Sequence, residues 1–414
     1  MNISFWISRR LSLDTGGSRT GIVVAVTGVA LAVAVMEFTL AVMVGFKHEI
    51  ERKLTGFDAQ ISIQPPVDSF NGVQRESLSM DDALLAIAGE SAPGARMELA
   101  VRQPGILKTD EDFEGALFIG RDASSPFEFE RGNIVEGVWP DYSADSTMNH
   151  IVVSRTMASA LGLTTGDRLY TTFIVDGDVK MRRQTVAGIY ESDFGDYDKT
   201  VVYASLPFLQ HVAGLDSVSG TAIELRGIDR DDIADVASEL QSELITQASL
   251  GHLDAYYPVS SVEQTGAMYF NWLALLDTNV IVIFVLMLAV ASFTLISSLF
   301  ILILERVRTI GILRALGSSK PVVRRIFVHM AMRIVAMGLI IGNVVGVGLL
   351  LVQKKWELVP LDPDMYYLSS VPVEIQVPAF IALNIGVVVA TWLILVLPAH
   401  LASGIDPAGA VKYD

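Results

Sequence analysis

The sequence predicts an α-helical membrane protein with four transmembrane helices and a large mixed α/β extracytoplasmic domain between helices 1 and 2. Composition is the first reason: 51% of the 414 residues are hydrophobic and the mean hydropathy is +0.46, which is too apolar for soluble domains alone. Second, four apolar runs are long enough to cross a hydrocarbon core about 30 Å thick. Third, strand and helix signals fill the long segment between the first two runs.

Charged residues interrupt two of the four apolar runs. Glu37 lies inside the first run, and His329 and Arg333 lie near the start of the third. The other two runs are uncharged, and the fourth has prolines only near its ends, where a helix tolerates them best. The expected segments are tail 1–21, helix 22–46, domain 47–276, helix 277–304, loop 305–325, helix 326–352, loop 353–376, helix 377–400 and tail 401–414.

Lys and Arg residues near the span ends indicate the orientation, because cytoplasmic loops carry an excess of them. One side of the predicted membrane has ten and the other has five. Both termini are therefore expected in the cytoplasm. The first run lacks a following small-residue processing site, so we interpret it as a signal anchor. The ten are Arg9, Arg10, Arg19, Arg306, Arg308, Arg314, Lys320, Arg324, Arg325 and Lys412, and the five are Lys47, Arg52, Lys53, Lys354 and Lys355.

Charge and cysteine content exclude several classes of function. Residues 47–276 contain 36 acidic and 17 basic side chains, a net charge of −19. This charge disfavours nucleic acid or an anionic surface as the main partner. The chain has no Cys, which excludes disulfide bonds, thiolate metal sites and a lipid-modified N-terminal Cys.

Capping and turn residues predict the elements of the 47–276 domain. Ser154 follows a short apolar strand, 151–153, and caps a helix over 155–161 that Gly162 ends. Asp176-Gly177-Asp178 predicts a tight hairpin turn, because these residues accept positive φ. The remaining predicted elements are the hairpin strands 168–175 and 179–189, a strand over 221–225, an amphipathic helix over 231–245, and helical continuations of the spans over 45–54 and 261–277.

Signatures of catalysis and of ATP binding are missing from the sequence. No Gly-x-x-x-x-Gly-Lys-Ser/Thr loop occurs, so energy for transport has to come from a partner protein. The six His residues lack His-x-x-x-His spacing, and no Gly-x-Ser-x-Gly turn is present. The acidic run of Asp110, Glu111, Asp112 and Glu114 is more typical of a solvated loop than of a cation site. We therefore predict that this chain is not an enzyme and holds no cofactor or metal.

Six passages distributed along the chain resemble a known family. They are AVMVGFKHEIERKLTGFDAQISI (41–63), IVVSRTMASALGLTTGDRL (151–169), VAGIYESDFGDYDKTVVYASLPFLQHV (186–212), ILERVRTIGILRALGSS (303–319), DMYYLSSVPVEI (364–375) and LPAHLASGIDPAGAVK (397–412). On these residues the chain is similar to the lipoprotein-releasing permeases LolC and LolE, within the wider family that includes MacB and FtsX.

Two departures from the family stand out. The tight turn at Asp176-Gly177-Asp178 lacks the longer insertion with which LolC-type relatives hook a carrier, so it looks LolE-like. Glu37 lies where the first span of the family is generally apolar.

The cytoplasmic loop at 305–325 is the strongest functional signal. Thr309 is suited to cap a short helix and Gly317 to end it, with apolar and basic side chains exposed together. A positively charged loop lying on anionic headgroups is the simpler interpretation. The resemblance instead implies a coupling helix that docks on an ATPase, because the apolar side chains are costly to expose. The implied coupling residues are Arg308, Thr309, Ile310, Ile312, Leu313, Arg314 and Leu316.

Two sets of membrane residues are further candidates. Gly338, Gly342 and Gly346 lie four apart on one helical face, which permits close approach of another helix, either within one subunit or across a dimer seam. Glu37 is expected to face a polar cavity, because intramembrane carboxyl groups are costly to expose to lipid. With Met36 and Leu40 it would line a substrate cavity; a hydrogen-bonded Glu inside the bundle is the alternative.

The resemblance implies a permease subunit of an ABC-type complex that extracts lipoproteins from the inner membrane. The implied partners are a cytoplasmic LolD-like ATPase, a second permease subunit that is identical or paralogous, lipoprotein substrates, a periplasmic carrier in indirect contact, and membrane lipid, but no nucleic acid. An FtsX-like regulator of a periplasmic hydrolase and a MacB-like exporter are the alternatives.

Overall fold

The chain divides into two compact units in the computed structural model, which describes residues 19–67, 74–305, 311–312 and 315–402. The helical unit contains the chain up to His48, Trp272–Pro360 and the chain from Ser370 onward. The α/β unit contains Glu49–Asn271 and a second, short segment, Leu361–Ser369.

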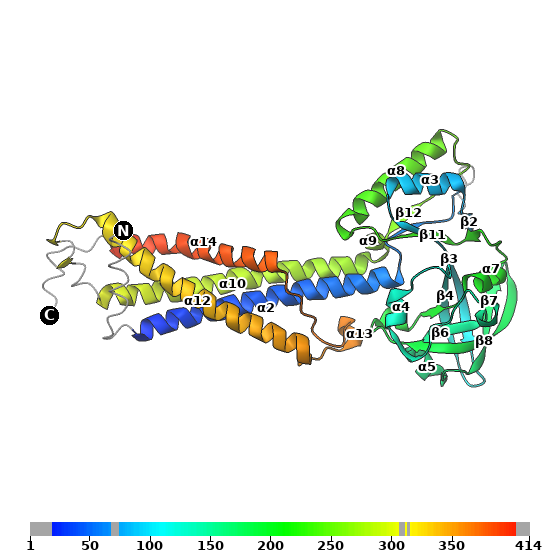
Figure 1. Cartoon of the computed structure of the whole chain (residues 1–414), viewed down its shortest axis with the longest axis horizontal. Coiled ribbons are helices and arrows are strands. Elements are labelled where there is room, and N and C mark those ends of the chain that lie inside the picture. Colours follow the sequence, from blue (N-terminus) through cyan, green and yellow to red (C-terminus); the bar gives the residue numbers. More distant parts are fainter. Residues whose placement is uncertain (1–18, 68–73, 306–310, 313–314, 403–414) are drawn as a thin grey trace. The chain divides into compact units, whose positions relative to one another are not determined.

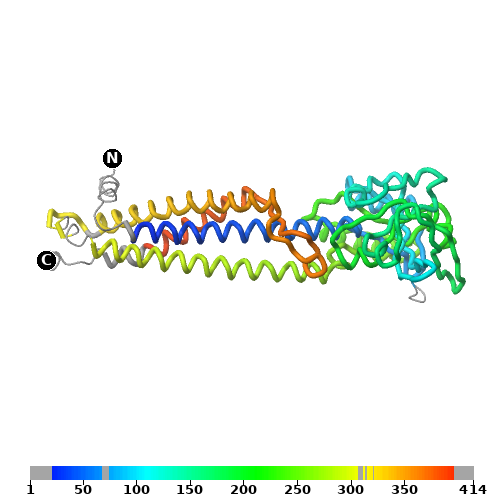
Figure 2. The backbone as a smooth tube through the Cα atoms, turned by 90° about the horizontal axis from the view of Figure 1, so that it is seen from below, coloured from blue at the N-terminus to red at the C-terminus, as the bar shows by residue number. Residues whose placement is uncertain are grey.

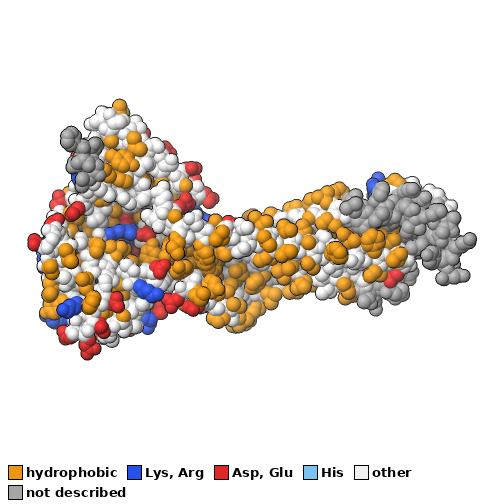
Figure 3. All heavy atoms as spheres, turned by 180° about the vertical axis from the view of Figure 1, so that it is seen from behind, with side chains coloured by type: hydrophobic (Ala, Val, Ile, Leu, Met, Phe, Trp, Pro, Cys, Tyr) orange, Lys and Arg blue, Asp and Glu red, His pale blue; other side chains and the backbone are white. Residues whose placement is uncertain are grey.

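Four long helices run side by side in the helical unit (Figures 1 and 2). Within the described residues they are long and apolar enough to cross a membrane. Their apolar side chains cover much of the surface seen in Figure 3. The helices are α2 (Arg19–Phe57), α10 (Ala267–Glu305), α12 (Lys320–Trp356) and α14 (Val377–Ala402).

Helix α2 is the most buried of these helices. In its most apolar window 56% of residues are buried, against 22% for α10 and α14 and 33% for α12. Ala25, Val29 and Val33 of α2 contribute to a core shared with the other three helices. At 1.5 Å per residue, the 39 residues of α2 and of α10 each span about 58 Å, so both extend beyond a hydrocarbon core about 30 Å thick.

A sheet of ten strands forms the centre of the α/β unit, as far as it is described. Its path is β12-β1-β11-β3-β4-β9-β6-β8-β5, and β7 pairs with both β3 and β8. The strands are β1 (Ile61–Ile63), β3 (Arg96–Lys108), β4 (Phe113–Arg121), β5 (Ile134–Gly137), β6 (His150–Ser154), β7 (Arg168–Val175), β8 (Asp178–Tyr190), β9 (Val201–Tyr203), β11 (Ala222–Arg226) and β12 (Val259–Ser261), while β2 (Leu78–Ser79) pairs separately with β10 (Ser219–Gly220).

The pairing of β7 with β3 closes part of this sheet into a ring of strands. The ring runs β3-β4-β9-β6-β8-β7 and returns to β3. The rings of Phe118 and Phe173, both fully buried, meet inside it with centroids 4.9 Å apart. Gly105 leaves room for them, because a Cβ there would lie 2.8 Å from the ring of Phe173.

Short helices surround the sheet (Figure 1). Among them, α3 and α8 pack against each other through buried Leu84 and Ala88 on α3 and Leu240 and Leu244 on α8. The helices of this unit are α3 (Asp82–Ser91), α4 (Glu128–Gly132), α5 (Arg155–Leu161), α6 (Gly195–Asp198), α7 (Leu206–Ala213), α8 (Ile233–Ser249), α9 (Val262–Thr265) and α13 (Pro363–Tyr366).

The local predictions for this unit are largely confirmed. Ser154 accepts a hydrogen bond from Met157 N at the start of α5, and Gly162 ends that helix with φ of +63°. The hairpin turns at Asp176 and Gly177, which have φ of +54° and +84°. The prediction of one helix over 261–277 is wrong in one respect: the helix is interrupted at Gly266, between α9 and α10.

Candidate functional site

Part of the predicted coupling segment lies outside the described residues, namely Arg308, Thr309, Ile310, Leu313 and Arg314. Ile312 and Leu316 are described and are 51% and 80% exposed. Leu316 N donates to Ile312 O at 2.9 Å, as in a helical turn. Gly317 has φ of +93°, the left-handed conformation that commonly follows a helix. The described part of this loop therefore exposes two large aliphatic side chains.

Polar side chains from three helices meet inside the helical unit. Glu37 on α2 is fully buried, and its Oε1 accepts a hydrogen bond from Asn384 Nδ2 on α14 at 3.3 Å. Asn384 and Asn343 on α12 exchange two amide hydrogen bonds of 2.8 and 3.1 Å. Side-chain hydrogen bonds hold helices together in lipid. This cluster therefore connects α2, α12 and α14.

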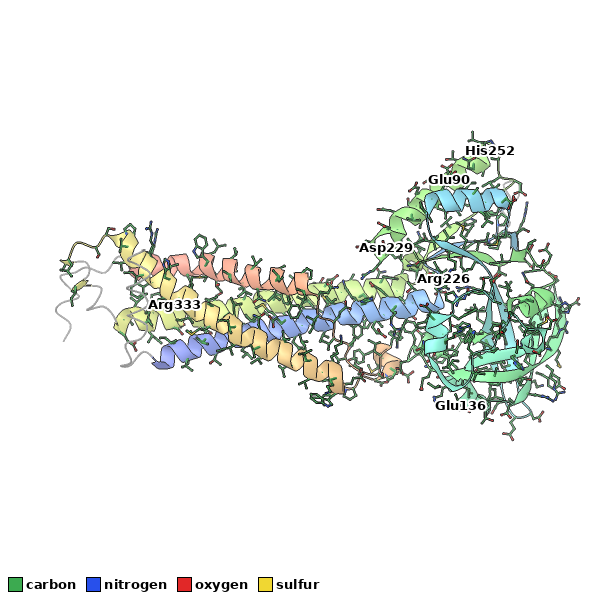
Figure 4. All side chains as sticks on the ribbon, viewed as in Figure 1. Glu90, Glu136, Arg226, Asp229, His252 and Arg333 are labelled. Atoms are coloured by element: carbon green, nitrogen blue, oxygen red, sulfur yellow. The ribbon has the colours of Figure 1, made fainter. Side chains whose placement is uncertain are left out.

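The second carboxyl oxygen of Glu37 has no hydrogen-bond partner among the described residues. Gly346 on α12 provides the space for it, because a Cβ at this position would meet Oε2. Arg333 is labelled on the same helix in Figure 4. It lies ten residues before Asn343, which is about 15 Å along the helix axis, so it is not at the level of Glu37.

The neighbours of Glu37 on α2 also face other parts of the same chain. Met36 is 3% exposed and belongs to the core of the four helices. Leu40 is partly buried and packs against a second apolar cluster that contains Leu350 and Phe380. The structure thus places Met36, Glu37 and Leu40 in contact with neighbouring helices.

The three glycines of α12 lie against α2. A Cβ at Gly338 would lie 2.7 Å from Val29, and one at Gly342 would lie 2.8 Å from Ala30 O. Each later glycine on α12 contacts a later residue on α2, so the two helices run in the same direction. The glycine face is therefore occupied by a helix of the same chain.

In the α/β unit, a network of charged side chains surrounds the end of α2. Arg102 donates to Asp58 at 2.7 Å and to Glu224 at 2.9 Å. Arg226, labelled in Figure 4, donates to the other oxygen of Glu224 at 2.9 Å and to Thr55 O. Burial alone would raise the pKa of Glu224, but the nearby arginines outweigh burial and lower it to about 2.

Clefts lie on either side of this network in the described α/β unit. One, of about 280 Å³, is lined by Arg102 and by hydroxyl groups such as those of Ser62 and Ser260. The other, of about 390 Å³, is lined by Arg121 and Arg226, among others. Arg102, Arg121 and Arg226 are already paired with carboxylates, so these clefts do not identify a ligand.

The surface of the α/β unit has two further features, an acidic run and an apolar face. Asp110, Glu111 and Asp112 are exposed between β3 and β4, and Glu114 is exposed near the start of β4. The outer face of the β7–β8 hairpin exposes large apolar side chains, with Tyr170 at 51%, Ile174 at 63%, Val179 at 67% and Met181 at 54%. A contiguous apolar surface of this kind is typical of a contact with another molecule.

Comparison with family models decides the family. The model described as MacB-like periplasmic core domain matches residues 22–243, more than half of the chain. This chain belongs to the MacB-like periplasmic core domain family. The second matching model, FtsX-like permease C-terminal, covers residues 281–407 of this MacB-like protein.

Curated relatives of this MacB-like protein align over most of its length. The transmembrane protein LolC of the lipoprotein-releasing system of Xylella fastidiosa (strain 9a5c) is 25% identical, with 94% of this chain and 93% of that protein covered. The corresponding LolE of Haemophilus influenzae is 22% identical, with 99% of both covered. The tight hairpin turn alone favoured the LolE branch. Over the whole chain the identities to LolC and LolE are similar, so they do not favour LolE over LolC.

Solved structures add a weaker likeness. The periplasmic region of MacB from Actinobacillus actinomycetemcomitans aligns with a TM-score of 0.35 and 11% identity, covering 53% of this chain and 96% of that region. The family models and the apolar helices, without this likeness, indicate a multi-pass membrane protein with a MacB-like periplasmic domain of mixed α/β fold.

Several residues of this MacB-like protein were not expected from the sequence. Asn343 and Asn384 are amides in the middle of apolar stretches of α12 and α14, and that is the signal that would have selected them. Arg102 and Glu224 lie on strands that carry other charged side chains as well, so no pattern in the sequence distinguished them, and a buried ion pair is the ordinary explanation of such charges.

Proposed function

We propose that this chain is a permease subunit of an ABC-type complex in the inner membrane that extracts lipoproteins and releases them toward a periplasmic carrier. The alignment with LolC and LolE supports this proposal, since it covers 94–99% of the chain and so includes both units. ATP hydrolysis in a separate subunit supplies the work. Each buried CH₂ of an acyl chain contributes about 0.8 kcal/mol to membrane binding, so lipid-anchored proteins leave slowly without such work.

The cytoplasmic contact is assigned to the loop between α10 and α12. Arg308, Thr309, Ile310, Ile312, Leu313, Arg314 and Leu316 would dock on a LolD-like ATPase. The exposure of Ile312 and Leu316 supports this assignment, because a protein partner would cover these apolar side chains.

The membrane contact with substrate is assigned to Met36, Glu37 and Leu40. All three contact neighbouring helices, so they would line a cavity only when α2 separates from α12 or α14. A second permease subunit, identical or paralogous, would form the other wall. Gly338, Gly342 and Gly346 are assigned to helix packing, and their contacts with α2 support that role.

Reconstitution with a candidate ATPase tests the proposal. ATP-dependent transfer of a tagged lipoprotein to a soluble carrier is the expected result, and Leu313→Asp should abolish it while membrane insertion is preserved. Loss is expected because an unpaired carboxylate in a desolvated contact costs on the order of 2 kcal/mol or more. If the complex instead stimulates a periplasmic hydrolase or exports a soluble amphiphile, the FtsX-like or MacB-like alternative replaces lipoprotein release.

Orientation is tested separately. Both termini are assigned to the cytoplasm. Single cysteines introduced by Ser12→Cys and Ser69→Cys into this Cys-free chain should differ in intact spheroplasts. A membrane-impermeant thiol reagent should label the second variant only; labelling of the first would reverse the assignment.

A further inference from the structure

Residues Leu361–Ser369, which connect α12 to α14 in the sequence, belong to the α/β unit. Leu361 N donates to Ser369 O at 2.9 Å, so the segment closes on itself around α13. The α/β unit is therefore continuous with the transmembrane helices not only through α2 and α10 but also through this segment.

Lys53 is the buried residue that holds the segment. It lies on the last turns of α2, is 5% exposed, and its Nζ donates to Tyr367 O at 2.9 Å. The same Nζ donates to Ser192 O, in the loop that follows β8. The charge of Lys53 is near Asp198: burial raises the pKa of that carboxyl, while hydrogen bonds from Ser192 and the charge of Lys53 oppose the rise.

Among the other contacts of the segment are ring contacts and an exposed ion pair, and its Leu368 is buried. The Tyr367 ring lies 4.9 Å from Phe194 and 5.3 Å from Tyr269, measured between centroids. Asp364 pairs with Lys199 at 3.2 Å, with both side chains more than half exposed, and such surface pairs contribute little. Tyr367 has φ of +60°, a left-handed conformation that is unfavourable for a bulky residue and persists only where contacts enforce it.

We propose that residues 361–369 form a releasable strap and that Lys53 is the positioning residue that fastens it to the α/β unit. The strained backbone is held by the buried ammonium group, by ring contacts, by the buried side chain of Leu368 and by an exposed ion pair, and in this proposal it alternates between an attached and a released state. Release would free the connection between α12 and α14 from the α/β unit; its place in a transport cycle rests on the proposed function, whereas attachment through Lys53 does not.

The attachment is tested on the purified full chain in lipid nanodiscs. Gly195→Cys and Asp364→Cys form a reporter pair, since a Cβ at Gly195 would lie 3.2 Å from Asp364 Oδ1 and the chain has no other Cys. Adding Lys53→Met should slow disulfide formation at least fivefold, because the strap is then attached less often. Lys47→Met, the same change six residues earlier on α2, removes an ion pair with Asp277 but no contact of the strap, and should leave the rate unchanged. Equal rates with Lys53→Met and Lys47→Met would refute the role of Lys53.

Hydrogen exchange separates release from unfolding. In Lys53→Met, amides of 361–369 should exchange faster while peptides from β3 and β8 retain the protection of the parent chain. Faster exchange throughout the α/β unit would show that Lys53 stabilises the whole unit, and would overturn the proposal of a local strap.

The functional consequence is tested in the complex with its ATPase. Oxidation of the reporter pair, which combines Gly195→Cys with Asp364→Cys, should block lipoprotein release but not ATP hydrolysis, and reductant should restore release. Full release from the oxidised complex would show that the strap need not open. Absence of release from the reduced complex would contradict the proposed function, while the nanodisc experiments would still decide the attachment.

Discussion

Glu37 in the helical unit and Glu224 in the α/β unit are both completely buried, yet they are stabilised in different ways. Glu224 accepts hydrogen bonds from two guanidinium groups, those of Arg102 and Arg226. Glu37 accepts one from an amide, that of Asn384, and its other oxygen has no partner among the described residues. The domain outside the membrane compensates a buried carboxylate with full positive charges, whereas the helices use neutral donors.

This contrast indicates which losses each unit tolerates. Removing an arginine from the α/β unit leaves a buried charge uncompensated, which is strongly destabilising. Changing Glu37 to a neutral side chain removes a polar group but leaves no charge behind. The expected losses of stability therefore range from that of a buried ion pair to that of one carboxyl oxygen replaced by an amide nitrogen.

The largest effect is expected for Arg102→Met. This change leaves Asp58 without its guanidinium partner and Glu224 with only Arg226, and should cost about 3–5 kcal/mol of stability. Thermal unfolding of the full chain in nanodiscs measures it, with Arg168→Met, an exposed arginine on β7, as the matched control. A loss no greater than that of the control would show that Arg102 does not compensate the buried acids.

Acid should weaken the same network. The pKa of Glu224 is 4.5 in its unperturbed state and about 2 in the folded protein, so ionised Glu224 contributes about 3 kcal/mol. Because the folded pKa is the lower one, this contribution is present above pH 4.5 and is lost as the pH falls toward 2. Unfolding measured between pH 6 and 3 should show this decline, and Glu224→Gln should flatten it. An unchanged slope in the variant would assign the decline to other carboxyl groups.

A smaller effect is expected where the helices touch. Gly346→Ala places a methyl group against Oε2 of Glu37, and overpacking of this kind costs about 1–3 kcal/mol. In a Glu37→Ala background the methyl group should be tolerated, because the space is then free. Unfolding of the two single variants and the double variant gives the coupling. Additive losses would indicate that Gly346 and Glu37 do not share this space.

The smallest effect is expected for Glu37→Gln. The amide keeps the shape and still accepts the hydrogen bond from Asn384, so stability should change by less than about 1 kcal/mol. Glu37→Leu, which removes the acceptor, should cost more. If Glu37→Gln proves as damaging as Glu37→Leu, the cluster depends on the acid itself rather than on a hydrogen-bond acceptor.

Features that depend on neighbouring residues could be predicted from the sequence. The cap at Ser154, the end of α5 at Gly162 and the turn at Gly177 each involve residues within a few positions of one another. Local sequence selects these conformations because capping side chains and glycines act on their own backbone. The four apolar helices could be predicted for a similar reason, since length and composition alone define them.

Features that join distant residues could not be predicted. Glu37 and Asn384 are 347 positions apart, and Lys53 and Tyr367 are 314 apart. No periodicity links such positions, because tertiary packing brings them together. Loop 353–376 was expected as a connection only, and Lys53 contacts it through the backbone carbonyl of Tyr367, a group that every residue carries and that no sequence pattern marks.

The parallel packing of α2 on α12 has a consequence for how these helices tolerate change. A helix turns by about 100° per residue, so deleting one residue between Ala30 and Ala34 would leave Val29 against Gly338 but rotate Glu37 by about that angle. Its carboxyl group would then point away from Asn384. Helix α2 should therefore accept many substitutions on its outer face while rejecting insertions and deletions, so that its length is constrained more tightly than its composition.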